Sequence, residues 1–239
     1  MSNSTSIPAL FITCEHGGND IPEDYRYLFA KAATELATHR GYDIGALSVF
    51  TLLEEAKLAD FYHSATTSRL FVELNRSPGH PRLWSEFTCD LSSTQKEEVL
   101  WQYYYSYRNG VEANISDAIN REQRVIHLSI HSFTPELDGK IREAEVGLLY
   151  DSRRPLEKQF CGQWQQELLD LAPTWRVRAN YPYRGSSDGF TTYLRKQFTP
   201  EQYLGIELEI NQKILKDSAN EVGVVIRKSI KRMKKWILK

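Results

Sequence analysis

The chain has few cysteines, and their number and spacing argue against a disulfide framework and against a zinc cluster built on cysteines. Only three occur in 239 residues, at Cys14, Cys89 and Cys161. An odd number leaves at least one thiol unpaired in any disulfide scheme, and the separations match no zinc cluster built on cysteines. At this length the chain can instead bury a substantial apolar core. We therefore expect a reducing, cytoplasmic setting.

Long apolar runs, a large net charge and linker-like segments are also missing. No apolar run approaches the roughly 20 residues that cross a bilayer, and residues 1–6 are polar, without the basic and apolar regions of a signal peptide. The formal net charge of −1 provides no global attraction to nucleic acid or to an anionic membrane. Because no repeat or low-complexity tract divides the chain, we expect one domain over residues 1–239.

The chain does contain short apolar runs that alternate with longer helical patterns, which predicts an α/β fold with helices on both faces of a sheet. Asp43 is a plausible N-cap for one helix, and residues 77–92, with two prolines and a glycine, are expected to form a loop that could cover a site. The predicted strands are residues 8–13, 59–64, 69–74, 125–131, 145–150, 175–179 and 203–210. The predicted helices are residues 23–37, 43–58, 93–121, 155–171, 187–198 and 213–238.

Two histidines stand where predicted strands end. His16 follows the apolar run 9–13 and opens a glycine-rich turn, and His131 follows the apolar run 125–130. In open α/β sheets, ligands bind in the crevice outside the carboxyl edges of the strands. A lone histidine is more often structural, but two imidazoles at one edge, with an acidic third ligand and water in the fourth position, would suit zinc.

We expect Asp43 to be the third metal ligand, a role that is compatible with capping a helix. His127 lies on the same strand face as His131 but about 13 Å away along the strand, so it is expected to be a structural neighbour. Three other polar residues near His16 remain alternatives for the third ligand: Glu15, Asn19 and Asp20.

The predicted strand in residues 68–76 carries groups that suit a substrate carboxylate. Arg69 stands at its start, and Asn75 and Arg76 stand at its exit. Guanidinium groups bind carboxylates through paired hydrogen bonds, and an asparagine can orient a carbonyl or amide. A surface turn is the alternative for Asn75 and Arg76. Asn180, in an irregular loop after another strand, is either a further substrate contact or part of an ordinary proline turn.

A late strand carries two acids on one face. Alternation over residues 203–210 puts Glu207 and Glu209 on one side and the apolar residues on the other. Two carboxylates on an inner strand are costly unless they meet a cation, water or each other. One of them would be suited to act as general base.

Taken in series, these motifs resemble the N-formylglutamate amidohydrolase family. The matching segments extend over residues 10–212 and are Glu15-His16-Gly17-Gly18, Asp43-Ile44-Gly45-Ala46, residues 68–76, residues 131–135, Arg142 with residues 146–150, residues 180–183 and residues 207–210. The resemblance implies a single-domain mixed sheet flanked by helices, related to zinc carboxypeptidases and aspartoacylases (phosphorylase/hydrolase-like). It also implies hydrolysis of an amide, other than a peptide bond, on an acyl amino acid.

The resemblance also implies roles for individual residues. His16 and His131 match metal-binding histidines, and Asn75 and Arg76 match a substrate-binding Asn-Arg pair. Glu209 resembles the catalytic glutamate, and Arg142 joins Arg76 as a candidate for holding the substrate carboxylate. The chain departs from its aspartoacylase-like relatives at Asn19, where they carry a glutamate ligand three residues after the first histidine.

The leading hypothesis is therefore a zinc-dependent amidohydrolase that cleaves the amide of a small N-acyl amino acid, such as an N-formyl amino acid, through metal-activated water. A zinc carboxypeptidase acting on short or cell-wall peptides is the close alternative. A different mechanism would use Cys14 as nucleophile and His131 as base.

A non-enzymatic alternative rests on the C-terminus, where basic residues accompany an apolar stripe at helical spacing. Such a helix could bind nucleic acid or a membrane surface. The simpler interpretation, which we favour, is that the stripe packs on the sheet and the basic face is solvated. The basic residues are Arg227, Lys228, Lys231, Arg232, Lys234, Lys235 and Lys239.

Overall fold

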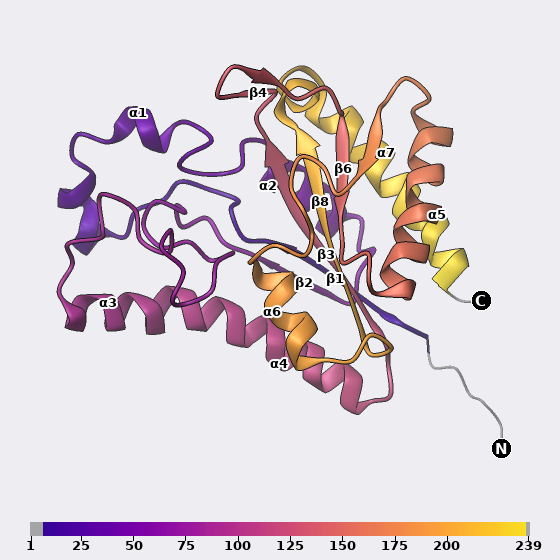
Figure 1. Cartoon of the computed structure of the whole chain (residues 1–239), viewed down its shortest axis with the longest axis horizontal. Helices are drawn as coiled ribbons and strands as arrows, with labels where there is room; N and C mark the ends of the chain where they lie inside the picture. Colours follow the sequence, from indigo (N-terminus) through magenta and orange to yellow (C-terminus); the bar gives the residue numbers. More distant parts are fainter. Residues whose placement is uncertain (1–6, 238–239) are drawn as a thin grey trace.

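The computed structural model of the protein describes residues 7–237, so the polar segment 1–6 and Lys239 lie outside the described residues. A six-stranded mixed sheet forms the centre, in the order β2-β1-β3-β8-β6-β7 (Figure 1). Strands β2, β1, β3 and β8 run parallel, β6 is antiparallel to β8, and β7 is parallel to β6. The strands are β1 (Ala9–Cys14), β2 (Phe61–Ser64), β3 (Val125–Phe133), β6 (Val146–Leu149), β7 (Val177–Ala179) and β8 (Tyr203–Asn211). A separate hairpin pairs β4 (Glu136–Leu137) with β5 (Lys140–Ile141).

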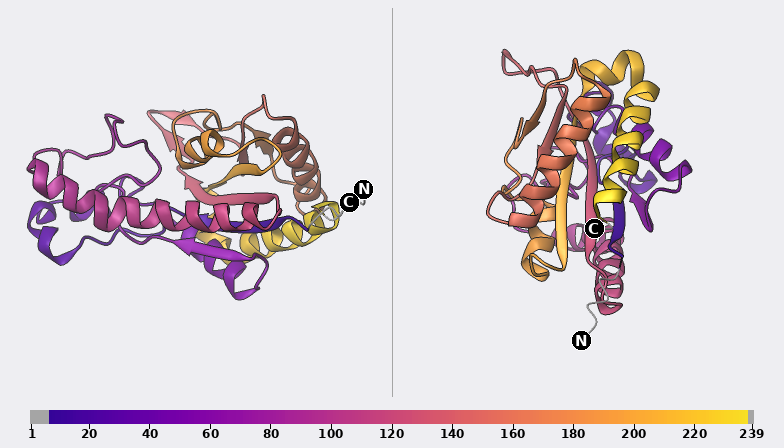
Figure 2. Two further views of the ribbon diagram at one scale, coloured as in Figure 1. Left: turned by 90° about the horizontal axis from the view of Figure 1, so that it is seen from below. Right: turned by 90° about the vertical axis from the view of Figure 1, so that its right-hand side faces the viewer.

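Helices cover both faces of this sheet, as predicted (Figure 2). One face packs against α2 (Ala46–Glu55), α5 (Pro155–Leu171) and α7 (Gln212–Ile237). The other packs against α4 (Ser106–Asn120) and α6 (Phe190–Gln197), and the core on this side extends to the 3₁₀ helix η1 (Glu23–Phe29), α3 (Ser93–Val99) and the π-helix η2 (Leu100–Tyr105). The fold class is therefore confirmed.

Alternation along the strands decides which side chains meet which layer. In β1, Leu10 and Ile12 join the core under α2, α5 and α7, whereas Ala9 and Phe11 join the opposite core. In β3 the apolar residues at 126, 128 and 130 face the first core, which leaves His127, Ser129 and His131 on the second face. One face of the sheet centre is therefore polar near the carboxyl ends of the strands.

The prediction of a strand at residues 69–74 is wrong. These residues form turns in which the amides of Phe71 and Val72 are both bonded to the Ser68 carbonyl. The apolar residues of the segment are nevertheless buried in the second core. A short apolar run signals burial, and burial alone does not require an extended backbone.

Two further predictions about helix boundaries need correction. Residues 23–37 form η1 and the short α1 (Ala33–Leu36) instead of one helix. Helix α2 begins after Gly45, which has φ of 84°, and Asp43 is not its side-chain cap. A residue with positive φ at this position turns the chain sharply, and the Asp43 carboxylate accepts no hydrogen bond from the first amides of α2.

Helix α7 packs its apolar stripe on the sheet side, as the simpler interpretation predicted. Val222, Ile226, Ile230 and Met233 are buried against the core shared with α2 and α5. The side chains of Lys234 and Lys235 are not among those described. Over residues 7–237, no helix has both the length and the apolarity needed to cross a membrane.

Candidate metal centre

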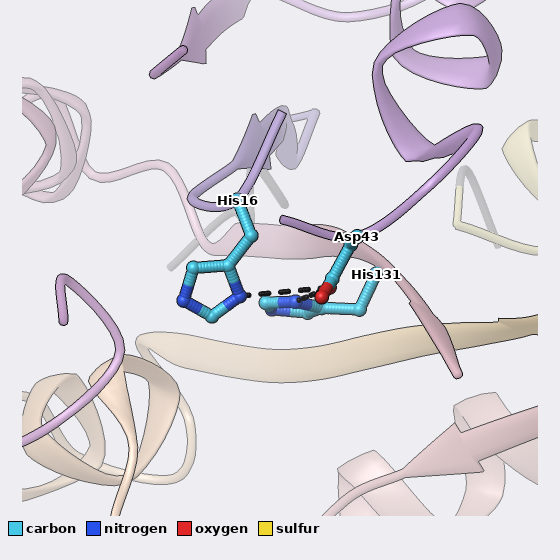
Figure 3. A group of neighbouring side chains, drawn as sticks. All are labelled: His16, Asp43 and His131. Atoms are coloured by element: carbon cyan, nitrogen blue, oxygen red, sulfur yellow. Dashed lines mark hydrogen bonds and ion pairs between the residues drawn. The ribbon is translucent and has the colours of Figure 1, made fainter. Parts of the chain in front are cut away.

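Three residues that are far apart in the chain meet at the carboxyl edge of the sheet. His16 lies in the turn after β1, His131 lies in β3, and Asp43 lies in the loop before α2. Each offers a ligand atom, and these atoms lie within 4.8 Å of one another (Figure 3). The parallel pairing of β1 with β3 places the first two side by side. The Asp43 amide donates to the His16 carbonyl at 2.9 Å, which fixes the loop to the turn.

Asp43 bridges the two imidazoles. Its Oδ2 lies 2.8 Å from His131 Nδ1 and 3.5 Å from His16 Nδ1. Burial raises the pKa of Asp43, but the neighbouring His16 and His131 outweigh burial and hold the pKa well below its usual range. The Asp43 carboxylate is therefore charged and directed at both rings.

Glu73 lies behind His16 and was not singled out from the sequence. Its Oε1 bonds to His16 Nε2, and its Oε2 accepts from Arg69 Nε at 2.9 Å. Burial raises the pKa of Glu73, yet Arg69 and His16 together bring it below its usual range. The only signal in the sequence was a single acid within the apolar run Leu70-Phe71-Val72-Glu73-Leu74.

Glu15 occupies the corresponding position behind His131. Its Oε2 lies 3.3 Å from His131 Nε2, and the carboxylate is fully buried. Tyr107 donates its hydroxyl to Glu15 Oε1 at 3.0 Å, and Ser129 donates to Oε2. Burial raises the pKa of Glu15, but the hydrogen bond and charge of His131 lower it below its usual range.

Glu209 is an acid of β8 that interacts electrostatically with His131 and Asp43. It is the register partner of His131, is 5% exposed, and its Oε2 has no hydrogen-bond partner among the described residues. Burial raises the pKa of Glu209 to about 8, with His131 opposing and Asp43 reinforcing this rise. Glu207, two residues earlier on the same face, accepts from the Thr191 hydroxyl at 2.8 Å and is less buried.

A cavity of about 550 Å³ opens over these residues. Its lining includes several residues that were predicted to contact substrate, namely Arg69, Asn75 and Arg76. The loop over residues 81–86 contributes to the wall, as predicted for residues 77–92. The guanidinium of Arg69 is shared between Asp43, at 3.1 Å, and Glu73.

Other predicted site residues do not line this cavity. The Asn180 carboxamide oxygen accepts from the Tyr150 and Gly185 amides, so this side chain holds its own loop together. Arg142 bonds to Tyr183, which does line the cavity.

The residues that the sequence offered as alternative ligands or as a nucleophile make contacts away from the three-residue cluster. Asn19 donates to the Leu36 carbonyl at 2.9 Å, and Asp20 is exposed and bridges to Thr67. His127 bonds to Thr13 and Tyr203, as expected for a structural neighbour. Cys14 is buried in the first core, where burial raises the pKa of its thiol well above the usual value.

The residues present fit a divalent cation. Four carboxyl groups are buried in this cluster, those of Glu15, Asp43, Glu73 and Glu209. In the described part of the chain, Arg69 is the single guanidinium that forms ion pairs with any of them. His16 Nδ1 is buried without a hydrogen-bond partner among the described residues. Two imidazoles and a carboxylate are a donor set that zinc binds.

The fold and the cluster together define an α/β protein with a candidate metal centre at the carboxyl edge of its sheet. The chain belongs to the N-formylglutamate amidohydrolase family, whose model matches residues 8–215. It is thus an enzyme of a class that hydrolyses amide bonds.

Solved structures support the same fold. The protein is similar to a gene product from Agrobacterium tumefaciens, with a TM-score of 0.76 and 25% identity over 95% of this chain and 92% of that one. It is also similar to an N-formylglutamate amidohydrolase from Ralstonia eutropha JMP134, with a TM-score of 0.71 and 16% identity over 96% of this chain and 94% of that one. A comparison with curated proteins found no match.

Proposed function

We propose that the protein is a zinc-dependent amidohydrolase that cleaves the amide of an N-acyl amino acid, such as an N-formyl amino acid. The observation that carries this proposal is the cluster of His16, Asp43 and His131, which lines one cavity together with Glu209. His16 Nδ1 and Glu209 Oε2 are both buried without hydrogen-bond partners among the described residues. Such atoms are rare in folded proteins and call for a ligand.

His16, Asp43 and His131 would hold the ion. Zinc would supply Lewis acidity toward a carbonyl oxygen and toward water. Glu73 and Arg69 keep His16 and Asp43 in place. Glu73 bonds to His16, and Arg69 donates to both Glu73 and Asp43. This leaves Glu209 as the carboxyl group with an unused oxygen.

Glu209 is proposed to act as the general base. Because burial raises its pKa to about 8, the ionised form of Glu209 is the active one: its Oε2 would accept a proton from the attacking water and return it to the departing amine nitrogen, so that the group finishes unchanged. Glu207 is less suited, because it already accepts the Thr191 hydroxyl. The register pairing of Glu209 with His131 keeps the base next to the metal-binding group.

Asn75 and Arg76 are proposed to bind the substrate carboxylate. Both line the cavity, and both are held at its wall from α6 and the segment before it: Asn75 Oδ1 accepts from the Phe190 amide at 2.6 Å, and Arg76 donates to the Asp188 carbonyl. A guanidinium held in this way can still offer further N–H groups to an anion.

Metal analysis tests the proposal directly. We expect close to one zinc per chain in the purified protein and almost none in a His16→Ala, His131→Ala double variant. His80→Ala is the matched control, because His80 lies outside the cavity lining. Equal metal content in the wild-type protein and the double variant would refute the assignment.

A substrate panel then separates the two hydrolase hypotheses. N-formyl and N-acetyl amino acids should be hydrolysed faster than short peptides that present the same C-terminal residue. Faster turnover of the peptides would favour the carboxypeptidase alternative instead.

A further inference from the structure

Glu15 is a buried carboxylate that the proposed mechanism does not use. It is 0% exposed, and no lysine or arginine forms an ion pair with it in the described part of the chain. Burying a carboxylate in this way is costly unless specific donors surround it. Its contacts among the described residues are the Tyr107 and Ser129 hydroxyls and the His131 imidazole, and of these His131 is the group that can carry positive charge.

The strand register explains how Glu15 reaches His131. Thr13 pairs with Ser129 between the parallel strands β1 and β3. Two residues further along the chain stand Glu15, in the turn directly after β1, and His131, in β3, and their side chains are in contact. Glu15 therefore meets His131 from the neighbouring strand, on the side of the ring away from Asp43.

The two nitrogens of His131 have different surroundings. Nδ1 faces Asp43 Oδ2 at 2.8 Å, within the candidate metal centre. Nε2 lies 2.8 Å from Ser129 Oγ and 3.3 Å from Glu15 Oε2, and the Ser129 hydroxyl donates onward to the same carboxylate. A neutral imidazole that binds a cation through one nitrogen carries its proton on the other, and that proton needs an acceptor.

We propose that Glu15 is a positioning residue that, with Ser129, holds the proton of His131 on Nε2 and so presents Nδ1 to the metal. This inference rests on the proposed metal site. Tyr107 supports the arrangement by donating to Glu15 Oε1 at 3.0 Å, which leaves Oε2 for Ser129 and His131. Glu15 thus acts on metal affinity through His131 and does not touch the substrate.

The test compares zinc affinity in three full-length proteins: wild type, Glu15→Gln and Asp151→Asn. Zinc dissociation constants are measured on metal-stripped protein by competition with a chromophoric chelator. Loss of an outer carboxylate typically weakens metal binding 10- to 100-fold, and we expect a loss of about that size in Glu15→Gln. Asp151→Asn is the matched control: Asp151 is also largely buried, bonds to Arg153, and lies outside the cavity lining.

The outcomes separate this inference from the proposed function. Equal zinc affinity in wild type and Glu15→Gln would overturn the role of Glu15 while leaving the metal site intact. Failure of the wild-type protein to bind any divalent ion would overturn both. Weaker binding in Glu15→Gln, with the control unchanged, supports both.

A measurement on the wild-type protein covers the case in which Glu15→Gln does not fold. Nitrogen-15 NMR of the zinc-loaded protein should show a slowly exchanging proton on His131 Nε2, and a His131→Gln variant identifies the signal. A proton on Nδ1 instead would contradict the proposal.

Discussion

Acidification should destabilise this protein through His127, a histidine buried beside the candidate site but outside it. The side chain is 0% exposed, with Nε2 bonded to Thr13 Oγ1 and Nδ1 bonded to the Tyr203 hydroxyl, each at 2.7 Å. Burial lowers its pKa from 6.5 to about 4; Glu15 acts in the opposite direction, and Arg195 adds to the lowering. His127 is therefore neutral in the folded protein above about pH 4.

The sign and size of the effect follow from proton linkage. Between pH 6.5 and 4 the unfolded chain binds a proton at His127 that the folded chain does not, so the free energy of unfolding falls as pH falls through this window. One pKa unit corresponds to about 1.4 kcal/mol. The contribution of His127 is therefore a loss of about 3 kcal/mol by pH 4, a large part of the stability of a typical domain.

Urea unfolding followed by tryptophan fluorescence measures this loss. Metal-stripped wild-type protein and His127→Gln are compared at pH 7, 6, 5 and 4, with equal m-values required before free energies are compared. Glutamine retains hydrogen-bonding capacity toward Thr13 and Tyr203 but does not titrate. Since the carboxylates of the site are common to both proteins, the difference between the two pH profiles isolates His127. Parallel profiles would refute the reasoning.

Three further predictions test other parts of the structure. Glu209→Gln should lower kcat by about 10² to 10⁴ with unchanged zinc content, and full activity would exclude Glu209 as the base. Gly147→Ala should destabilise the protein by at least about 2 kcal/mol in urea unfolding, because an added Cβ would stand 1.7 Å from the Tyr181 carbonyl oxygen; unchanged stability would contradict this packing. Arg108→Met should raise KM several-fold at unchanged zinc affinity, because Arg108 Nη1 donates to the carbonyl of Arg76, which is proposed to bind the substrate carboxylate. A change in kcat alone would argue against this role of Arg108.

Much of the sheet was predictable because its strands have simple patterns. The apolar runs at residues 8–13, 125–131 and 203–210 correspond to β1, β3 and β8, and alternation correctly placed Glu207 and Glu209 on one face. Parallel strands that end at a common edge also made it reasonable to expect His16 and His131 close together, and the structure brings them together.

The segment 68–76 shows where sequence patterns were insufficient. Its apolar residues are buried as the pattern indicated, but the backbone forms turns and directs Glu73 at His16. Hydrophobicity reports whether a residue is buried and says little about backbone direction when a run is short. The role of Asn180 was also not predictable from a local pattern. Its carboxamide oxygen accepts hydrogen bonds from the amides of residues 150 and 185, and the first of these is distant in the sequence.

The sequence by itself determined which segments form β1, β3 and β8, which faces of those strands are polar, and that two histidines lie toward the carboxyl edge of the sheet. Only the tertiary structure decided which acid serves which partner: Asp43 between the rings, Glu73 behind His16, Glu15 behind His131 and Glu209 with a free oxygen. The physical reason is that strand periodicity is a local property of the chain. The positions of Asp43 and Glu73 depend instead on loops whose conformations are set by packing against distant elements.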